Sequence, residues 1–285
     1  MSLIFALAVS LTPAAPVQAG WTEAIEPFEI ADDLYYVGTA DLAAYLFVSD
    51  EGHILIDAPL EENVDLLLRN IRSLGFDPAD IEVLLASHAH FDHVGGLARM
   101  RELTGARVVS SAADGEMMAR GGVGPAGAGP AYPAVQSDRT IGHLDTVELG
   151  PWRLTAQLTP GHTPGCTSWS GGAAIGGAPV TFVSVCSLSI LPGFQLVGAA
   201  QTYPGMGTAY CGSLATLEAL RPDLFLGPHG SFIGLNEKSA ALARGEERAF
   251  VDPEGYRAYL DRARSSVART LTAQGHTGGC ANLGG

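Results

Sequence analysis

Three histidines and one aspartate fall within six consecutive positions of this chain, where residues 88–93 read His-Ala-His-Phe-Asp-His. A fold that buries this segment needs a bound cation, because a carboxylate and several imidazoles away from water are costly when they lack partners. Zinc binds both imidazole nitrogens and carboxylate oxygens. The segment therefore predicts a metal-bearing active site, and it restricts the chain to folds that can enclose one.

The sequence around this segment predicts where it lies in the fold. Residues 81–86 form a short apolar run with the length and β-branched content of a buried strand. Residues 94–105 are typical of a helix that ends at Gly105. We therefore expect the histidine segment in a loop at the carboxyl end of a strand, where ligand sites of α/β sheets gather.

The spacing within the segment predicts two metal ions. If the loop is extended, His88 and His90 point the same way and can hold one ion. Asp92 and His93 follow the turn into the helix, so we expect them to face a second point. Ions of two-metal hydrolytic sites lie roughly 3.5–4 Å apart.

Further ligands are expected from two later histidines, His162 and His229. Both follow short strand-like runs, at 152–158 and 224–226, and both are flanked by Gly and Pro, which fix a loop backbone. The remaining histidines are interpreted as structural or surface residues: His53, His143 and His276.

Residues 88–93, 161–165 and His229 together resemble the metallo-β-lactamase superfamily, and the resemblance extends from about Trp21 to about Arg264. It implies an α/β fold, the αβ/βα four-layer sandwich, with two mixed sheets, outer helices and metals at the rim where the sheets meet.

Within this superfamily, the chain is similar to subclass B3 metallo-β-lactamases, above all in residues 186–196. Many other hydrolases of the superfamily, such as the glyoxalase II type and the lactonases, carry a bridging Asp after the fourth ligand. Here the strand expected at 179–185 leads into Cys186 instead. The B3 resemblance implies two zinc ions, the first held by His88, His90 and His162, and the second by Asp92, His93 and His229. Because His93 is present, Cys186 is not needed as a ligand.

The resemblance implies a zinc-dependent hydrolase that opens the β-lactam ring of antibiotics. Zinc-bound hydroxide, oriented by Asp92 as the catalytic carboxylate, would attack the lactam carbonyl. Ser187 and Ser189 lie where the resembled enzymes bind the substrate carboxylate. The pocket wall is expected to include four apolar side chains: Trp21, Phe91, Leu191 and Phe194. The alternatives are another hydrolase of the same fold, a lactonase or thioesterase, and a metal-binding member without activity.

Composition restricts the partners of the chain. The formal net charge of −14 argues against nucleic acid, which requires a basic surface. A hydrophobic content of 47% fits one well-buried domain, and the loop at 121–134 is long enough to be functional. We expect a monomer that acts on a small-molecule β-lactam, with no membrane span.

The two ends of the chain are expected to lie outside this domain. Residues 1–19 resemble a signal peptide, although no Lys or Arg precedes the apolar run, so we expect a periplasmic or secreted protein. The catalytic domain is assigned to residues 20–272, and the Gly-rich tail at 273–285 is expected to lack structure. Four cysteines allow three disulfide pairings, which the sequence leaves open.

Other expected elements are a hairpin from 44–48 and 54–57, and helices over 60–74, 213–220 and 256–271. Asp252 is predicted to cap the last helix, with Pro253 in its first turn.

Overall fold

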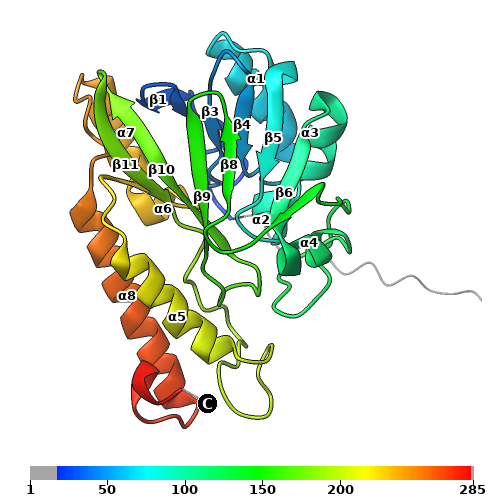
Figure 1. The fold of residues 1–285 in the computed structure, drawn as a ribbon, viewed down its shortest axis with the longest axis vertical. Coiled ribbons are helices and arrows are strands. Elements are labelled where there is room, and N and C mark those ends of the chain that lie inside the picture. Colours follow the sequence, from blue (N-terminus) through cyan, green and yellow to red (C-terminus); the bar gives the residue numbers. More distant parts are fainter. Residues whose placement is uncertain (1–17, 284–285) are drawn as a thin grey trace, which may run out of the picture.

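A computed structural model describes residues 18–283 of the protein, so most of the predicted signal peptide lies outside the described residues. Two sheets stand face to face with helices outside both (Figure 1), which confirms the predicted four-layer α/β sandwich. Within residues 18–283, no helix combines the length and apolarity that crossing a bilayer requires.

The first sheet has seven strands in sequence order. They are β1 (Phe28–Ala31), β2 (Leu34–Tyr36), β3 (Tyr45–Phe47), β4 (His53–Ile56), β5 (Ile81–Leu85), β6 (Arg107–Ser111) and β7 (Arg139–Ile141). The first four strands pair antiparallel, and β4 to β7 pair in parallel. The parallel strands bring their carboxyl ends to one edge, where the histidine segment begins.

The second sheet has five strands in the order β12-β11-β10-β9-β8. They are β8 (Thr146–Leu149), β9 (Trp152–Leu158), β10 (Thr167–Ile175), β11 (Ala178–Ser184) and β12 (Leu224–Leu226). Only β11 and β12 pair in parallel. The strands predicted at 152–158 and 224–226 are therefore confirmed.

Alternation along the strands explains the layers. In β4, Ile54 and Ile56 face the core between the sheets, whereas Leu55 faces the helices outside. A strand buried on both faces needs apolar residues at every position. The two sheets meet through aromatic rings: Phe47 of β3 lies 5.0 Å from Trp152 of β9 between ring centroids, in an edge-to-face pair.

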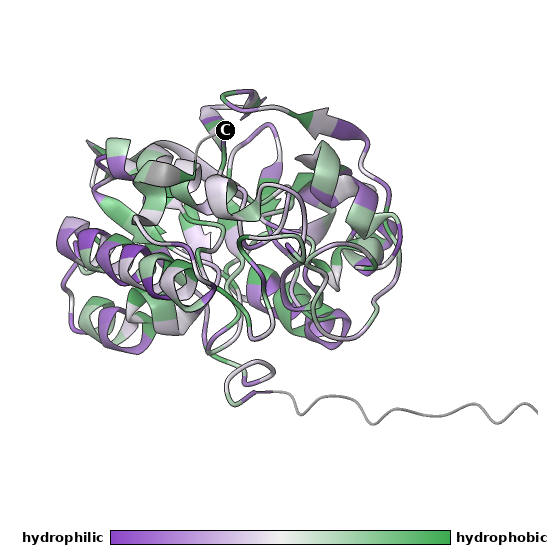
Figure 2. Cartoon of the chain, turned by 90° about the horizontal axis from the view of Figure 1, so that it is seen from below, coloured by the Kyte–Doolittle hydropathy of each residue, from purple (hydrophilic) through white to green (hydrophobic). Residues whose placement is uncertain are grey.

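Helices cover the outer faces of both sheets. The helices α1 (Val64–Ser73) and α3 (Leu97–Thr104) pack on the first sheet, and α5 (Met206–Ala219) and α8 (Pro253–Ala273) pack on the second. Their ribbons carry both hydrophilic and hydrophobic residues (Figure 2), as expected for helices that cover a sheet with one face. Shorter helices are α2 (Phe91–Val94), α4 (Ala112–Met118), α6 (Gly230–Ile233) and α7 (Leu235–Ala243), with 3-10 turns at Glu61–Asn63, Pro78–Asp80 and Gly279–Asn282.

Three expected elements differ in the structure. The helix predicted over 94–105 is two helices, α2 and α3, because Gly96 breaks it: its N–H donates to the Pro59 carbonyl at 2.7 Å, and a Cβ there would lie 2.7 Å from Val64 Cγ2. The helix expected at 213–220 begins earlier, at Met206. The tail also differs from the structureless segment expected, because Cys280 is bonded to Cys211 of α5.

Candidate metal centre

The histidine segment leaves β5 in an extended conformation and then turns into α2. His90 has φ −91° and ψ 149°, and the helix begins at the next residue, Phe91. His88 and His90 therefore precede the turn, whereas Asp92 and His93 follow it. This backbone change separates the segment into two pairs of side chains, as the spacing predicted.

The structure brings the six predicted side chains together in two groups. His88, His90 and His162 form one group, whose candidate ligand atoms all lie within 4.8 Å of one another. The second group is Asp92, His93 and His229, under the same distance limit. The two groups adjoin, because the rings of His88 and His93 lie only 4.2 Å apart between centroids.

The loop between β9 and β10 supplies His162. Gly161 has φ +148°, and a Cβ there would lie 2.8 Å from the ring of Tyr210 on α5. Only glycine allows the loop to approach α5 so closely. The hydroxyl of Tyr203 donates to the Gly161 carbonyl at 3.0 Å. These contacts position the next residue, His162, over the segment from the first sheet.

The chain after β12 supplies His229, which immediately precedes α6. A β-bridge joins its backbone to Leu42, which lies between β2 and β3 of the first sheet. Asp41 accepts a hydrogen bond from the Ser231 backbone N–H at 2.9 Å and contacts His229 Nδ1 at 3.1 Å. The group that includes His229 is thus assembled from the edges of both sheets.

Each histidine of the first group has one ring nitrogen in contact with the protein. His88 Nδ1 lies 3.1 Å from Ser87 Oγ, and His90 Nε2 lies 2.8 Å from the Ala126 carbonyl oxygen. His162 Nδ1 lies 2.7 Å from the carbonyl oxygen of Ser189. Such contacts fix the ring and leave the other nitrogen for a metal.

One free nitrogen of this group is buried, so it needs a partner. His88 Nε2 is buried without a hydrogen-bond partner among the described residues. An unpaired buried polar atom destabilises the fold unless a group from outside the protein, such as a cation, serves as its partner. Together with the second group, this site offers five imidazoles and one carboxylate, a donor set that fits a divalent metal.

The electrostatics of both groups favour a cation. Burial lowers the pKa of His88 and His162 well below the usual range, and it also lowers the pKa of His90. These rings are therefore neutral near pH 7, and neutral imidazole is the form that binds metals. Burial opposes ionisation of Asp92, but the adjacent His93 outweighs it and lowers the pKa of Asp92.

Three aspartates support the candidate ligands, and sequence reasoning did not identify them. Asp57 approaches His93 Nδ1 at 3.8 Å and accepts a hydrogen bond from the Ser87 hydroxyl at 2.6 Å. Burial raises the pKa of Asp57 to about 6. Asp41 has a pKa of about 2, because hydrogen bonds from His229 and Ser231 outweigh its partial burial.

Asp114, the third aspartate, joins the two loops that carry the first group. Its carboxylate accepts hydrogen bonds from the Ala89 N–H at 2.9 Å, the Thr163 hydroxyl at 2.7 Å and the Gly165 N–H at 2.7 Å. Burial raises its pKa to about 6. Its position in α4, directly after β6, gave no sequence signal, because the contacts exist only in the assembled fold.

A cavity of about 270 Å³ opens beside both groups. Ser187 and Ser189, predicted to contact substrate, line it, and the Ser187 hydroxyl accepts a hydrogen bond from the Ser189 N–H at 3.2 Å. Three of the four predicted wall residues also line it: Trp21, Phe91 and Leu191. The prediction for Phe194 is wrong, because this ring packs in the core instead. Sequence reasoning missed Ser231 and Phe232, which line the cavity from α6.

All four cysteines are paired, Cys166 with Cys186 and Cys211 with Cys280. The sulfurs of Cys166 and Cys186 lie near His88, but their bond to each other removes both as thiolate ligands. This pairing fits the expectation that Cys186 is not needed as a ligand. The other histidines lie apart from both groups: His53 is buried beside Phe76, and His143 is exposed.

Comparison with known proteins shows the family. The sequence model of the metallo-β-lactamase superfamily matches residues 42–174. A subclass B3 metallo-β-lactamase of Bradyrhizobium japonicum is 35% identical with a TM-score of 0.84, covering 90% of this chain and 97% of that one. The metallo-β-lactamase of Legionella gormanii is 37% identical with a TM-score of 0.86, covering 90% and 99%. The chain belongs to the metallo-β-lactamase superfamily, and its fold is similar to that of subclass B3 enzymes.

Curated relatives match a shorter region. A probable metallo-hydrolase of Bacillus subtilis is 30% identical over 47% of this chain and 62% of its own length. A hydroxyacylglutathione hydrolase of Methylobacterium nodulans is 36% identical over 38% of this chain and 33% of its own length. The chain therefore spans between one third and about three fifths of these relatives. The matches support a metallo-hydrolase family for this chain, whose own described residues include a histidine-rich candidate metal site.

Proposed function

We propose that this protein is a zinc-dependent β-lactamase, which hydrolyses the ring amide of β-lactam antibiotics. The observation that carries the proposal is the likeness to solved metallo-β-lactamases at 35–37% identity over nine tenths of the chain. The six candidate ligands, arranged as two groups of three, support it.

In this proposal two zinc ions occupy the two groups, with His88, His90 and His162 at one and Asp92, His93 and His229 at the other. Bound zinc supplies a Lewis acid for the carbonyl oxygen and lowers the pKa of a coordinated water. The chain holds the ligand rings in fixed orientations through their second nitrogens.

Asp92 has a second role beyond binding. Its carboxylate is ionised near pH 7 because its pKa is lowered. It lies 3.3 Å from His93 Nε2 and 3.7 Å from His229 Nε2, between the candidate ligands of its group. We infer that it accepts a hydrogen bond from the attacking water and orients it toward the lactam carbonyl.

The cavity provides contacts that suit a small bicyclic acid. Trp21 and Phe91, whose ring centroids lie 5.8 Å apart, form an apolar wall. Ser187 and Ser189 provide donors for the carboxylate that β-lactams carry on the ring fused to the lactam. A monomer is sufficient for this reaction, because every proposed group comes from one chain.

The absence of a carboxylate after β11 separates this proposal from the alternative hydrolases. Hydrolases of the glyoxalase II type carry a bridging Asp at the point where this chain has Cys186, and Cys186 is bonded to Cys166. The identity with a hydroxyacylglutathione hydrolase nevertheless favours a thioesterase or lactonase as the second candidate.

We also propose that the protein is exported to the periplasm or secreted. The two disulfides support this location, because such bonds persist in oxidising compartments. Fractionation of cells that express the full chain, followed by mass determination of the mature N-terminus, tests it. Cleavage near Ala19 is expected, and full-length protein confined to the cytoplasm would contradict it.

The activity is tested by nitrocefin hydrolysis with purified, metal-loaded protein. We expect turnover that a chelator abolishes and zinc restores, with two equivalents of zinc bound per chain. Lactone and thioester panels are assayed beside penicillins, cephalosporins and carbapenems. Loss of turnover in His162→Ala excludes a contaminating enzyme. Turnover of a thioester or lactone with no hydrolysis of any β-lactam would overturn the proposal in favour of the second candidate.

A further inference from the structure

A second cavity, of about 260 Å³, adjoins the candidate active-site cavity. The two share three lining residues, Ser189, Ser231 and Phe232, so they adjoin at these side chains. The rest of the second cavity is lined by Leu188 and four residues of α8: Tyr259, Arg262, Ala263 and Ser266. We call it the α8 cavity.

The α8 helix is fixed against the predicted substrate loop. The hydroxyl of Tyr259 accepts a hydrogen bond from the Leu188 backbone N–H at 2.9 Å. Arg262 lies three positions after Tyr259, so it is on the same face of the helix. Ala263 is buried and holds this face against the core. Arg262 therefore lines the α8 cavity from a helix that these contacts hold in place.

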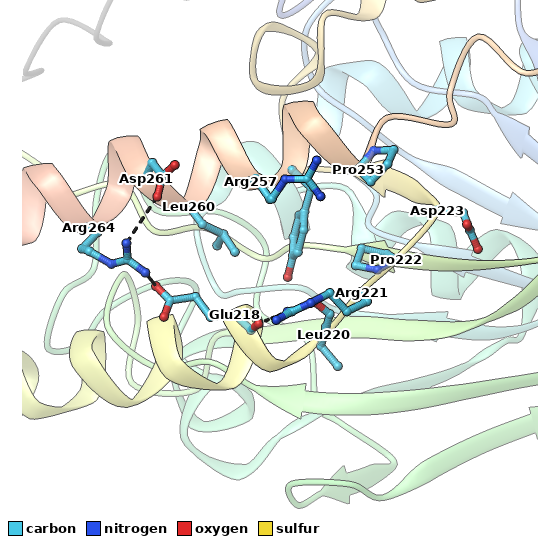
Figure 3. Close-up of a pocket in the computed structure, with 11 residues that line it drawn as sticks. Glu218, Leu220, Arg221, Pro222, Asp223, Pro253, Arg257, Leu260, Asp261 and Arg264 are labelled. Carbon is cyan, nitrogen blue, oxygen red and sulfur yellow. Dashed lines mark hydrogen bonds and ion pairs between the residues drawn. The ribbon is translucent and has the colours of Figure 1, made fainter.

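Arg262 is the one charged residue among those that line the α8 cavity. The ion pairs found within residues 18–283 do not include it. Other arginines near the opposite face of α8 are already paired or contact carbonyls. Figure 3 shows a separate pocket between α5 and α8, which we call the outer groove. In it, Arg264 contacts both Asp261 and Glu218, and Arg221 donates to the Glu218 carbonyl.

The charge of Arg262 contrasts with its surroundings. The chain has a net charge of −14, so its overall field repels an anionic substrate. Sequence reasoning found no cation near Ser187 and Ser189 because Arg262 lies more than 70 positions further along the chain. A guanidinium beside hydroxyl donors is a suitable site for a carboxylate, which it can bind with two parallel hydrogen bonds.

We propose that the α8 cavity is a subsite for a carboxylate of the substrate, with Arg262 as its cation and Ser189 and Ser231 as neutral donors. This inference rests on the proposed β-lactamase function and adds the residue that recognises the anionic group. The carboxylate can come from two sources: the ring carboxylate that β-lactams share, or a second carboxylate on a side chain.

Three penicillins distinguish these sources. Benzylpenicillin carries the ring carboxylate alone, its methyl ester carries none, and carbenicillin carries a second one on its side chain. The variant Arg262→Gln removes the charge and keeps a long polar side chain on an exposed helix position, so it should fold. Arg257→Gln is the matched control, because Arg257 is exposed on the same helix and lines the outer groove instead.

For Arg262→Gln, we expect KM to rise about fivefold for the acids that use the subsite, with kcat unchanged, and we expect the rise to shrink at high salt. A rise for benzylpenicillin and carbenicillin but not for the ester assigns the ring carboxylate. A rise for carbenicillin alone assigns the side-chain carboxylate. Unchanged KM for every compound, or the same rise in Arg257→Gln, overturns the proposal.

A failure of the proposed function is recognised separately. If the metal-loaded wild type hydrolyses none of the three compounds, the β-lactamase proposal fails. In that case, the dissociation constants of the same compounds replace KM, measured by quenching of tryptophan fluorescence, since Trp21 lines the adjoining cavity. A weaker binding of the acids to Arg262→Gln than to wild type would still support the carboxylate subsite, and equal binding would overturn it.

Discussion

The two disulfides lie in different parts of the molecule. Removing each one in turn should therefore distinguish effects on stability from effects on metal binding. Cys211–Cys280 closes a loop with a sequence separation of 69, and Cys166–Cys186 closes one with a separation of 20. If a disulfide acts by restricting the unfolded chain, these loops correspond to about 4 and about 3 kcal/mol of free energy of unfolding. We therefore expect the Cys211→Ala/Cys280→Ala variant to lose more stability than the Cys166→Ala/Cys186→Ala variant.

The expected order for metal binding is the reverse. Cys166 follows the loop that carries His162, and Cys186 precedes Ser187. This disulfide therefore joins the loop of a candidate metal ligand to the loop of the predicted substrate-binding serines. Its removal should weaken zinc binding and raise KM, whereas removal of Cys211–Cys280 should leave both nearly unchanged.

Urea unfolding of metal-free protein measures the first effect, and zinc content with nitrocefin kinetics measures the second. The reasoning is refuted if loss of Cys211–Cys280 changes the free energy of unfolding by less than about 1 kcal/mol, well below the usual range. It is also refuted if loss of this distant pair reduces zinc content as much as loss of Cys166–Cys186.

Three further predictions follow from the site and the helix caps. His162→Ala and His229→Ala should each lose about one equivalent of zinc by elemental analysis, and nitrocefin turnover should fall by more than the ~100-fold typical of a lost supporting residue; retention of both equivalents in either variant would contradict the grouping. Burial raises the pKa of Asp114 from 3.8 to about 6. Between these pH values the folded chain keeps a proton on Asp114 that the unfolded chain has lost. The free energy of unfolding should therefore fall by ~3 kcal/mol as pH rises from about 4 to about 6. Asp114→Asn should remove that part of the pH dependence in urea titrations of metal-free protein, and an identical profile in both proteins would exclude this role. Asp252→Ala removes the acceptor of the Gly255 N–H at 2.7 Å and should destabilise the protein by about 1 kcal/mol in the same assay, with no effect on zinc content; an unchanged midpoint would show that the cap is dispensable.

Local patterns predicted the strands and the caps of this fold well. The run at 224–226 coincides with β12, and Asp252 caps α8 with Pro253 in the first turn, as predicted. These features depend on residues that are adjacent in the chain, so the physical cause of each strand and cap can be identified from the sequence. The six candidate ligands also lie together as expected, and metal binding by them stays a prediction until it is measured.

Features that depend on distant contacts could not be predicted in the same way. The start of α5 at Met206 includes two glycines that disfavour a helix, yet Tyr210 is buried there and donates to the Ser189 carbonyl at 2.7 Å. Tertiary packing outweighs local propensity at this point. The Gly-rich tail similarly has the composition of a flexible segment, and its bond to Cys211 is visible only once α5 and α8 are in place.

The supporting aspartates illustrate a third reason. Asp41 and Asp57 precede the ligands they contact by 188 and 36 positions, and no spacing rule connects them. Their role follows from the arrangement of the sheets. The ring nitrogen of a histidine that does not bind metal needs a hydrogen-bond acceptor, and the fold brings these aspartates to that position.

The candidate ligands come from both halves of the sandwich, with His88 to His93 after β5, His162 after β9 and His229 after β12. No half of the chain holds a complete set, so a metal can distinguish the finished molecule from any partly assembled one. Ligands that bind only the native state increase its population in proportion to their concentration. In the proposed exported zinc protein, zinc supply would then govern how much of the newly made protein survives proteolysis, as well as how fast the survivors work.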